Sequence, residues 1–94
     1  MENQEIRQNE SEFFVEDDPV MQCATNALFV LSKLGKISIK AKGLYIPNAV
    51  SIANIITENF LKNNSKVDKI NLDSKISDKD GRMISNIEII LLKD

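Results

Sequence analysis

Residues 36–50 read KISIKAKGLYIPNAV and join the clearest strand signal of the chain to a helix start. Between Lys36 and Lys42, apolar and polar residues alternate without interruption, which is the period of a strand with one buried face. Gly43 ends this pattern, and Pro47 suits the first turn of a helix, where its missing N–H is not needed. The stretch therefore predicts a half-buried strand, a turn and a helix in direct succession.

The outward face of this predicted strand is basic. Lys36, Lys40 and Lys42 share it with Ser38. The strand leads to a turn whose helix begins with unpaired backbone N–H groups, and both lysine side chains and helix N-termini bind phosphate. The pattern suits a phosphate-binding surface, and it also suits a solvated strand followed by a plain turn.

An aromatic segment and a helix precede this stretch. Residues 12–16 read EFFVE and predict a short strand. Asp18 and Pro19 predict an N-cap and a first helical residue, and apolar residues at three- and four-residue intervals extend the helix to Gly35. Residues 1–11 carry too few apolar side chains to pack, so we expect a flexible acidic tail ahead of one domain over residues 12–94.

A second helix and a bulged strand follow the central stretch. The helix is expected from Pro47 to about Lys62. Residues 66–76 alternate loosely, with Val67 out of phase with the apolar residues after it. A bulge near Asp68 would bring both parts of this strand onto one face.

The chain is predicted to end in a hairpin. Asp80-Gly81 favours a type I′ turn, and residues 83–92 form the last strand. This strand is apolar on both faces in its second half, which is typical of a central strand. The order of elements predicts an α+β fold: a two-layer β-α-β-α-β-β sandwich with a four-stranded mixed sheet and two helices on one face.

Charge is distributed unevenly along the chain. Residues 1–18 hold seven acids and one base, a sum of −6, whereas residues 19–94 hold seven acids and eleven bases, a sum of +4. Ten of the twelve bases are lysines, which suit backbone phosphates better than bidentate reading of base edges. We therefore expect a mildly basic domain that follows an acidic segment.

Composition excludes several kinds of chemistry. The chain has no histidine and a single cysteine, Cys23, so histidine base catalysis, an internal disulfide and a cysteine-based zinc site are excluded. Cys23 lies in an apolar helical pattern and is interpreted as a packed side chain. We expect Glu58 and Glu88 to be isolated charges without an interacting partner. With no nucleophile or phosphate-loop motif, we expect no enzyme activity, no cofactor, no metal and no small-molecule substrate.

No apolar run approaches the roughly 20 residues that span a bilayer. The polar, acidic start of the chain is also unlike a secretory signal. We therefore expect a cytoplasmic protein with no membrane partner.

Five groups of short motifs are more specific in combination than any one alone. They are Asp18-Pro19-Val20-Met21, Ile39-Lys40-Ala41-Lys42-Gly43, Ile46 with Ala49-Val50, Asn59-Phe60-Leu61, and Asp80-Gly81-Arg82 with Ile87-Glu88-Ile89. In this order they resemble the Alba family of archaeal chromatin and RNA-binding proteins, over roughly residues 13–93. The resemblance implies a dimer that lays the loop after its second strand along a duplex backbone and reaches into the minor groove with two hairpins. It also implies contact between dimers through an aromatic at the place of Phe60.

The chain departs from the family pattern at its phosphate contacts. DNA-coating members carry Gly-Lys-Lys-Pro where this chain has residues 16–19, Glu-Asp-Asp-Pro, and Arg-Gly-Arg where it has residues 42–44, Lys-Gly-Leu. Pro47 stands where a serine often opens the second helix. The carboxylates of Glu16, Asp17 and Asp18 would stabilise the first helix through its dipole, and they would also repel a phosphate.

Two sets of site residues follow from these patterns. The predicted nucleic-acid-binding residues are Lys40, Lys42, Tyr45, Lys75, Lys79 and Arg82. Tyr45 suits base stacking or a cap over the core, and the hairpin cations alternate with acids, which also suits a solvated turn. Ile52 and Ile55 widen the apolar stripe of the second helix, so we predict that they form a dimer or dimer–dimer interface with Phe60.

We interpret the chain as an Alba-like dimer that binds DNA or RNA, largely without sequence preference, through phosphate contacts of weakened affinity. The alternative is an acidic paralogue that forms a heterodimer with a basic Alba-like protein and modulates its coating of DNA. The acidic N-terminal segment favours such a partner, since opposite charges promote encounter. Under either interpretation we expect association with the chromosome.

Overall fold

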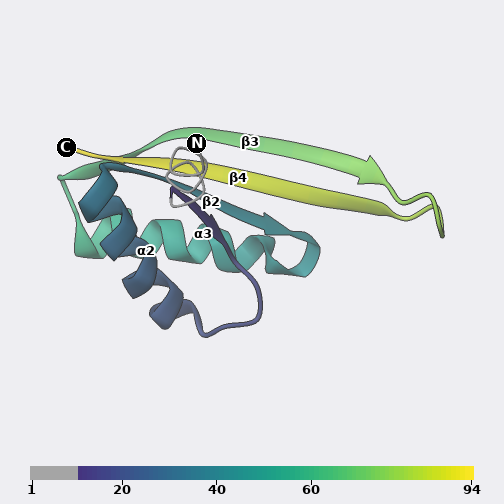
Figure 1. Ribbon diagram of the computed structural model, residues 1–94, viewed down its shortest axis with the longest axis horizontal. Helices are drawn as coiled ribbons and strands as arrows, with labels where there is room; N and C mark the ends of the chain where they lie inside the picture. The colour runs from purple at the N-terminus through teal and green to yellow at the C-terminus, as the bar shows by residue number, and fades with distance from the viewer. Residues whose placement is uncertain (1–10) are drawn as a thin grey trace, which may run out of the picture.

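The computed structural model describes residues 11–94, so most of the predicted tail lies outside the described residues. The elements are β1 (Glu12–Phe14), α2 (Val20–Leu34), β2 (Lys36–Lys42), a 3-10 turn (Gly43–Tyr45), α3 (Ile46–Ile55), a π-helical turn (Ile56–Phe60), β3 (Ser65–Ile76) and β4 (Met83–Lys93). Figure 1 shows both helices on one face of the sheet. The predicted two-layer α+β fold is confirmed.

The four strands form one mixed sheet in the order β1-β2-β4-β3. β1 pairs with β2 in parallel, and the other two pairs are antiparallel. β4 is central, as predicted. β2 is also interior, so the basic face of this strand lies within the sheet and not along its edge. The β3–β4 hairpin extends well beyond the helices (Figure 1).

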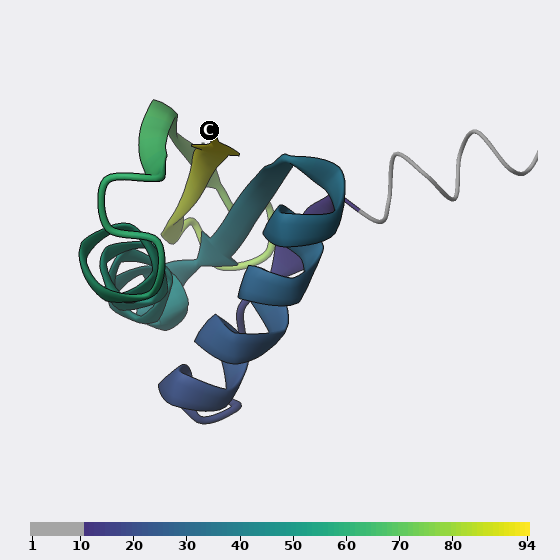
Figure 2. The same cartoon turned by 90° about the vertical axis from the view of Figure 1, so that its left-hand side faces the viewer.

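The hydrophobic core lies between the sheet and the two helices. Ile37, Ile39, Ile89 and Leu91 face the helices from the middle strands and are almost completely buried. They meet small and branched residues of α2, of α3 and of the π-helical turn, chiefly Ala24, Ala27, Leu31, Ala49, Ile52 and Ile56. Figure 2 looks nearly along α3, with α2 beside it in the same layer. Burial of each large aliphatic side chain contributes about 1.5 to 3 kcal/mol.

The two ends of α2 differ in how well the sequence predicted them. Gly35 ends the helix at φ 79°, and its N–H donates to the carbonyl of Leu31, as a C-terminal glycine should. At the other end, Pro19 is the N-cap residue, with ψ 136°, and not the first helical residue. Its carbonyl accepts the N–H of Cys23 at 3.0 Å. The predicted cap by Asp18 is therefore wrong, because no side chain caps this helix.

α3 begins and ends differently from the prediction. It starts at Ile46, one residue before Pro47, after a 3-10 turn that opens at Gly43 with φ 53°. It ends in a π-helical turn, where the N–H of Leu61 donates to the carbonyl of Ile56 at 2.8 Å. The helical segment thus stops at Phe60, two residues before the predicted end at Lys62.

The bulge predicted near Asp68 is confirmed by a register shift between Val67 and Lys69. Val67 pairs with Leu91, and Ile70 pairs with Ile89. Since directly paired residues share a face, the bulge places both apolar residues of β3 on the helix side.

The hairpin loop has the predicted bounds but not the predicted turn type. It spans residues 77–82, where the N–H of Gly81 donates to the carbonyl of Ser77 at 3.0 Å. A type I′ turn needs two consecutive residues at positive φ. Only Gly81, at 72°, has a positive φ in this loop, so the type I′ prediction is wrong.

Candidate functional site

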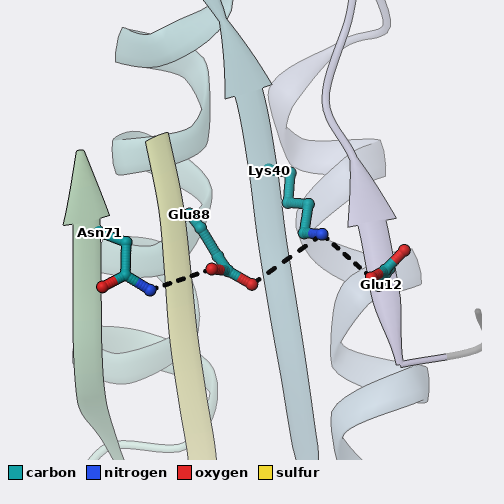
Figure 3. Close-up of polar contacts among 4 residues, drawn as sticks. All are labelled: Glu12, Lys40, Asn71 and Glu88. Carbon is teal, nitrogen blue, oxygen red and sulfur yellow. Dashed lines mark hydrogen bonds and ion pairs between the residues drawn. The ribbon is translucent and has the colours of Figure 1, made fainter. Parts of the chain in front are cut away.

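The sheet face that points away from the helices carries a polar network across all four strands, shown in Figure 3. Lys40 Nζ on β2 lies 3.0 Å from Glu12 Oε2 on β1 and 4.0 Å from Glu88 Oε2 on β4. Asn71 Nδ2 on β3 donates to Glu88 Oε1 at 3.0 Å. We call these four residues the cross-sheet network. It arises because the strand register sets Lys40 opposite Glu88 and Glu88 opposite Asn71.

The cross-sheet network keeps Glu88 ionised. The hydrogen bond from Asn71 is the largest cause that lowers the pKa of Glu88, and Ser38, Lys40 and Lys36 lower it further while burial acts in the opposite direction. The expectation that Glu88 is isolated is therefore wrong. The ammonium group of Lys40 is shared between two carboxylates, so little of its charge is left for an external phosphate.

Lys42 and Lys75 lie on the same open face and differ from Lys40. Both are exposed, and neither takes part in an ion pair within residues 11–94. Register places Lys42 opposite Asn86 and Lys75 opposite Ile84. These two lysines therefore offer charge to an external anion.

The hairpin loop holds the other two predicted cations. Lys79 is exposed, and Arg82 Nε lies 3.6 Å from Asp80 Oδ2 in an exposed pair that contributes little to stability. Arg82 and the turn at Gly43 and Leu44 line one hollow of about 790 Å³. The fold thus brings the turn after β2 and the hairpin loop to the same end of the molecule.

A second concavity, of about 750 Å³, lies at the open sheet face beside the cross-sheet network. Its lining includes Phe14, Tyr45, Lys42, Lys75 and Asn86. The charged groups of the lining are three carboxylates and three ammonium groups, namely those of Glu16, Asp73, Glu88, Lys40, Lys42 and Lys75. Its formal charge therefore cancels.

Tyr45 lines this concavity and also packs partly against the core. Its place against the core agrees with a cap over the core, and stacking on a base stays a prediction. Sequence reasoning missed Phe14 and Asn86. Two adjacent phenylalanines in a strand point to opposite faces, so one of them had to point outward, which is the signal for Phe14.

The acidic loop between β1 and α2 consists of Glu16, Asp17 and Asp18, all exposed. None of the three side chains makes a capping hydrogen bond to α2. The loop therefore presents its negative charge to solvent next to the concavity, which Glu16 helps to line.

Cys23 lies nearby on α2 and is buried. Burial, and secondly the charge of Asp18, raises the pKa of the Cys23 thiol, so this cysteine stays protonated at neutral pH.

The predicted interface residues fall into different environments. Ile52 is 0 % exposed because it faces the sheet from α3, so its assignment to an interface is wrong. Ile55 is partly buried against the core, and Phe60 is 37 % exposed at the end of the π-helical turn. Ile55 and Phe60 remain candidates for contact with another subunit.

An apolar surface that the sequence did not single out lies on the helix-side face of the hairpin. Register places Val67, Ile70, Leu72, Ile76 and Met83 on the face that carries the core residues Ile87, Ile89 and Leu91. All five are exposed, Leu72 at 72 %. We call these five residues the apolar row. The sequence feature that indicates this surface is the apolar alternation of the two hairpin strands, which continues beyond the part of the sheet that the helices cover.

No group of three His, Cys, Asp or Glu side chains in residues 11–94 is arranged to hold a metal ion. Over the same residues, neither helix has the length and apolar character needed to cross a bilayer.

Comparison with known proteins gives consistent matches. The sequence model of the Alba family matches residues 11–74. The curated DNA/RNA-binding protein Alba of Nitrosopumilus maritimus is 33 % identical over 79 residues, which cover 81 % of this chain and 83 % of that protein.

Solved structures agree with this match. Alba from Thermoplasma volcanium has a TM-score of 0.76 and 30 % identity, and the match covers 87 % of this chain and 99 % of that one. An Alba protein of Trypanosoma brucei has a TM-score of 0.73 and 19 % identity, covering 89 % of this chain and 69 % of that one. At that identity the second match shows the fold alone.

Proposed function

Because the chain belongs to the Alba family, we propose that it binds DNA or RNA through contacts of its cationic side chains with phosphate, largely without sequence preference. The observation that carries the proposal is the 33 % identity to a curated DNA/RNA-binding protein over most of both chains. Lysine contacts with phosphate position a protein on nucleic acid and do not read sequence.

The cations available for such contacts support this proposal. Lys42, Lys75, Lys79 and Arg82 are exposed and gather around the turn after β2 and along the hairpin. Lys40 contributes less, because Glu12 and Glu88 compensate its charge. Tyr45 stands beside these cations, where its ring can contact a sugar or base.

We propose that the affinity for duplex DNA is low. Glu16, Asp17 and Asp18 stand exposed beside the concavity that Lys42 and Lys75 line, so a phosphate near this loop meets repulsion as well as attraction. Of the three lysines that line this concavity, only Lys42 and Lys75 take part in no ion pair. Few phosphate contacts mean few released counterions, and counterion release supplies most of the affinity that does not depend on sequence.

A titration at several salt concentrations tests the proposed function. Fluorescence anisotropy with a labelled 20-base-pair duplex and the matching single strand should show binding at 20 mM salt that weakens as salt rises. The logarithm of the duplex association constant should fall against log salt with a slope of about −0.9 for each phosphate contact. Binding to neither probe at low salt would contradict the proposal.

We further propose that the protein is a homodimer through the apolar row. Soluble monomers rarely leave this many large apolar side chains of one surface uncovered. The five residues run along two paired strands and are interrupted by the Ser74–Ser85 pair. Leu72→Lys should convert the dimer to a monomer in light scattering after size exclusion. Phe29→Lys is the matched control, because Phe29 is equally exposed but lies on α2. A dimer that survives Leu72→Lys would contradict this interface.

A second candidate function is that of an acidic partner for a basic Alba-family protein. The exposed acidic loop favours this function. In a heterodimer, the acidic loop of this chain would repel the DNA phosphates, whereas the basic partner would attract them. Native mass spectrometry of this protein mixed with a basic Alba-family protein should then show mixed dimers. Homodimers that do not exchange subunits would exclude this function.

A further inference from the structure

The concavity on the open sheet face has features of a site for a base and not only for a backbone. We propose that it receives a single unpaired nucleotide, with the base against Phe14 and Tyr45 and the phosphate at Lys42 and Lys75. This inference rests on the proposed function and narrows its ligand to single strands or to nucleic acid with unpaired bases.

Size and charge both favour a base in the concavity. Its volume of about 750 Å³ lies in the usual range of ligand sites, about 300 to 1,000 Å³. Its three carboxylates and three ammonium groups cancel, so it attracts no polyanion as a whole. A flat, uncharged, polar group fits such a lining. The helical backbone of a duplex would instead meet the acidic loop at its rim.

Phe14 supplies the surface for stacking. It is 65 % exposed on the edge strand β1 and points to the open face, since it pairs with Lys40. The ammonium group of Lys40 lies 5.8 Å from the ring centroid, at the outer limit of a cation–π contact. Much of the ring thus stays accessible. Exposed aromatic rings on a sheet are the usual platforms for unpaired bases.

Asn86 supplies hydrogen bonding. Its Oδ1 is buried and has no hydrogen-bond partner within residues 11–94. A buried carbonyl oxygen without a partner is unfavourable, and an amino or imino group of a base would satisfy it. Register places Asn86 between Lys42 and Asp73, so the same residue lies next to the proposed phosphate contact.

The experiment compares three probes by fluorescence anisotropy at one low salt concentration. They are a 12-nucleotide single strand, the same strand with abasic residues in place of its bases, and the matching duplex. The first two carry the same phosphates, so their difference reports the bases. Stacking of one base should make the normal strand bind roughly 5 to 100 times more tightly than the abasic strand.

Single substitutions test whether the difference in affinity between the normal and the abasic strand arises at the concavity. Phe14→Leu should lower the affinity for the normal strand towards that for the abasic strand, while the affinity for the abasic strand and the duplex stays unchanged. Phe29→Leu is the control, because it removes an exposed ring from α2 in the helix layer. Asn86→Ser should produce a smaller loss of the same kind. Circular dichroism verifies that each variant is folded.

The outcomes separate this inference from the proposed function. Equal affinity for the normal and abasic strands, with salt-dependent binding of both, overturns the nucleotide site and leaves the proposed function intact. Binding to none of the three probes overturns both. Displacement of the normal strand by about 1 mM adenosine monophosphate would assign the concavity to free nucleotides and overturn its assignment to a strand.

Discussion

Lys40 and Lys42 lie on the same face of the same strand, two positions apart, and yet only one of them is available to an external anion. Lys40 lies 3.0 Å from Glu12 and pairs in register with Glu88. Lys42 has no ion pair with any residue from 11 to 94 and opens onto the concavity. The open face thus has an ion-paired lysine in its middle and a lysine without an ion pair at its end, and the difference depends on which neighbouring strand supplies a carboxylate.

The largest change in binding should come from reversing the charge of the acidic loop beside the concavity. Asp17→Lys with Asp18→Lys removes two repulsive charges and adds two possible phosphate contacts. Duplex affinity should rise on the order of 50-fold or more at 0.1 M salt, with a salt slope steeper by about 1.8. Anisotropy titrations measure both quantities.

Glu58→Lys is the control for this reversal, because Glu58 is exposed on the π-helical turn in the helix layer. It should raise affinity far less. If the double reversal changed affinity no more than the control, the acidic loop would not face the nucleic acid.

The difference between Lys40 and Lys42 can be tested directly by replacing each of the two lysines in turn. Lys42→Ala should lower duplex affinity on the order of five- to tenfold at 0.1 M salt and reduce the slope by about 0.9, the share of one phosphate contact. Lys40→Ala should lower duplex affinity less than Lys42→Ala does, because it removes no direct phosphate contact and only leaves the carboxylates of Glu12 and Glu88 without their cation. Equal losses for the two variants would break the distinction between the two parts of the face.

A smaller gain should follow from releasing Lys40. Glu12→Gln removes the carboxylate 3.0 Å from its ammonium group, while Glu88 remains at 4.0 Å. Duplex affinity should therefore rise about two- to threefold, below the effect of a full phosphate contact. The double variant Glu12→Gln with Lys40→Ala should lose this gain. A gain that persists without Lys40 would show that Glu12 repels the ligand directly.

The smallest expected effect concerns stability in acid. The folded state lowers the pKa of Glu88 below its ordinary value of 4.5, so the unfolded chain binds its proton first as pH falls. The stabilisation is complete above pH 4.5 and is lost as pH falls through the lowered value. Urea unfolding between pH 6 and 3 should show a shallower acid loss for Glu88→Gln, by less than about 1 kcal/mol. Parallel curves for both proteins would contradict this role.

The fold was predicted from local patterns that the structure preserves. The alternation in residues 36–42 gave β2 with its observed bounds, and the phase slip at Val67 gave the bulge. Such signals survive because the buried face of each strand must be apolar. The type I′ prediction was wrong because a favoured residue pair does not fix the backbone conformation of the loop around it.

The site was harder to predict, because its properties depend on contacts between distant residues. Lys40 is neutralised by Glu12, which lies 28 residues away in the sequence. No local sequence pattern predicts the register of β1 and β2 that brings these two residues together. Ile52 showed the same difficulty, since the width of an apolar stripe does not tell whether a sheet or another subunit covers it. The exposed side of Phe14 could have been predicted, but its neighbours in the concavity could not.

The bulge at Asp68 has a consequence for how this surface can vary among relatives. Without Asp68, the side chains of Val67, Lys69 and Ile70 would alternate regularly between the two faces of the sheet. All remaining side chains of β3 would stay on the face that they occupy now. Loss of Asn71 instead would invert the strand on one side of the gap and move Leu72 and Ile76 from the helix-side face to the open face of the sheet. Homologues one residue shorter in this strand are therefore expected to have lost the equivalent of Asp68, and a sequence alignment should place its gap there.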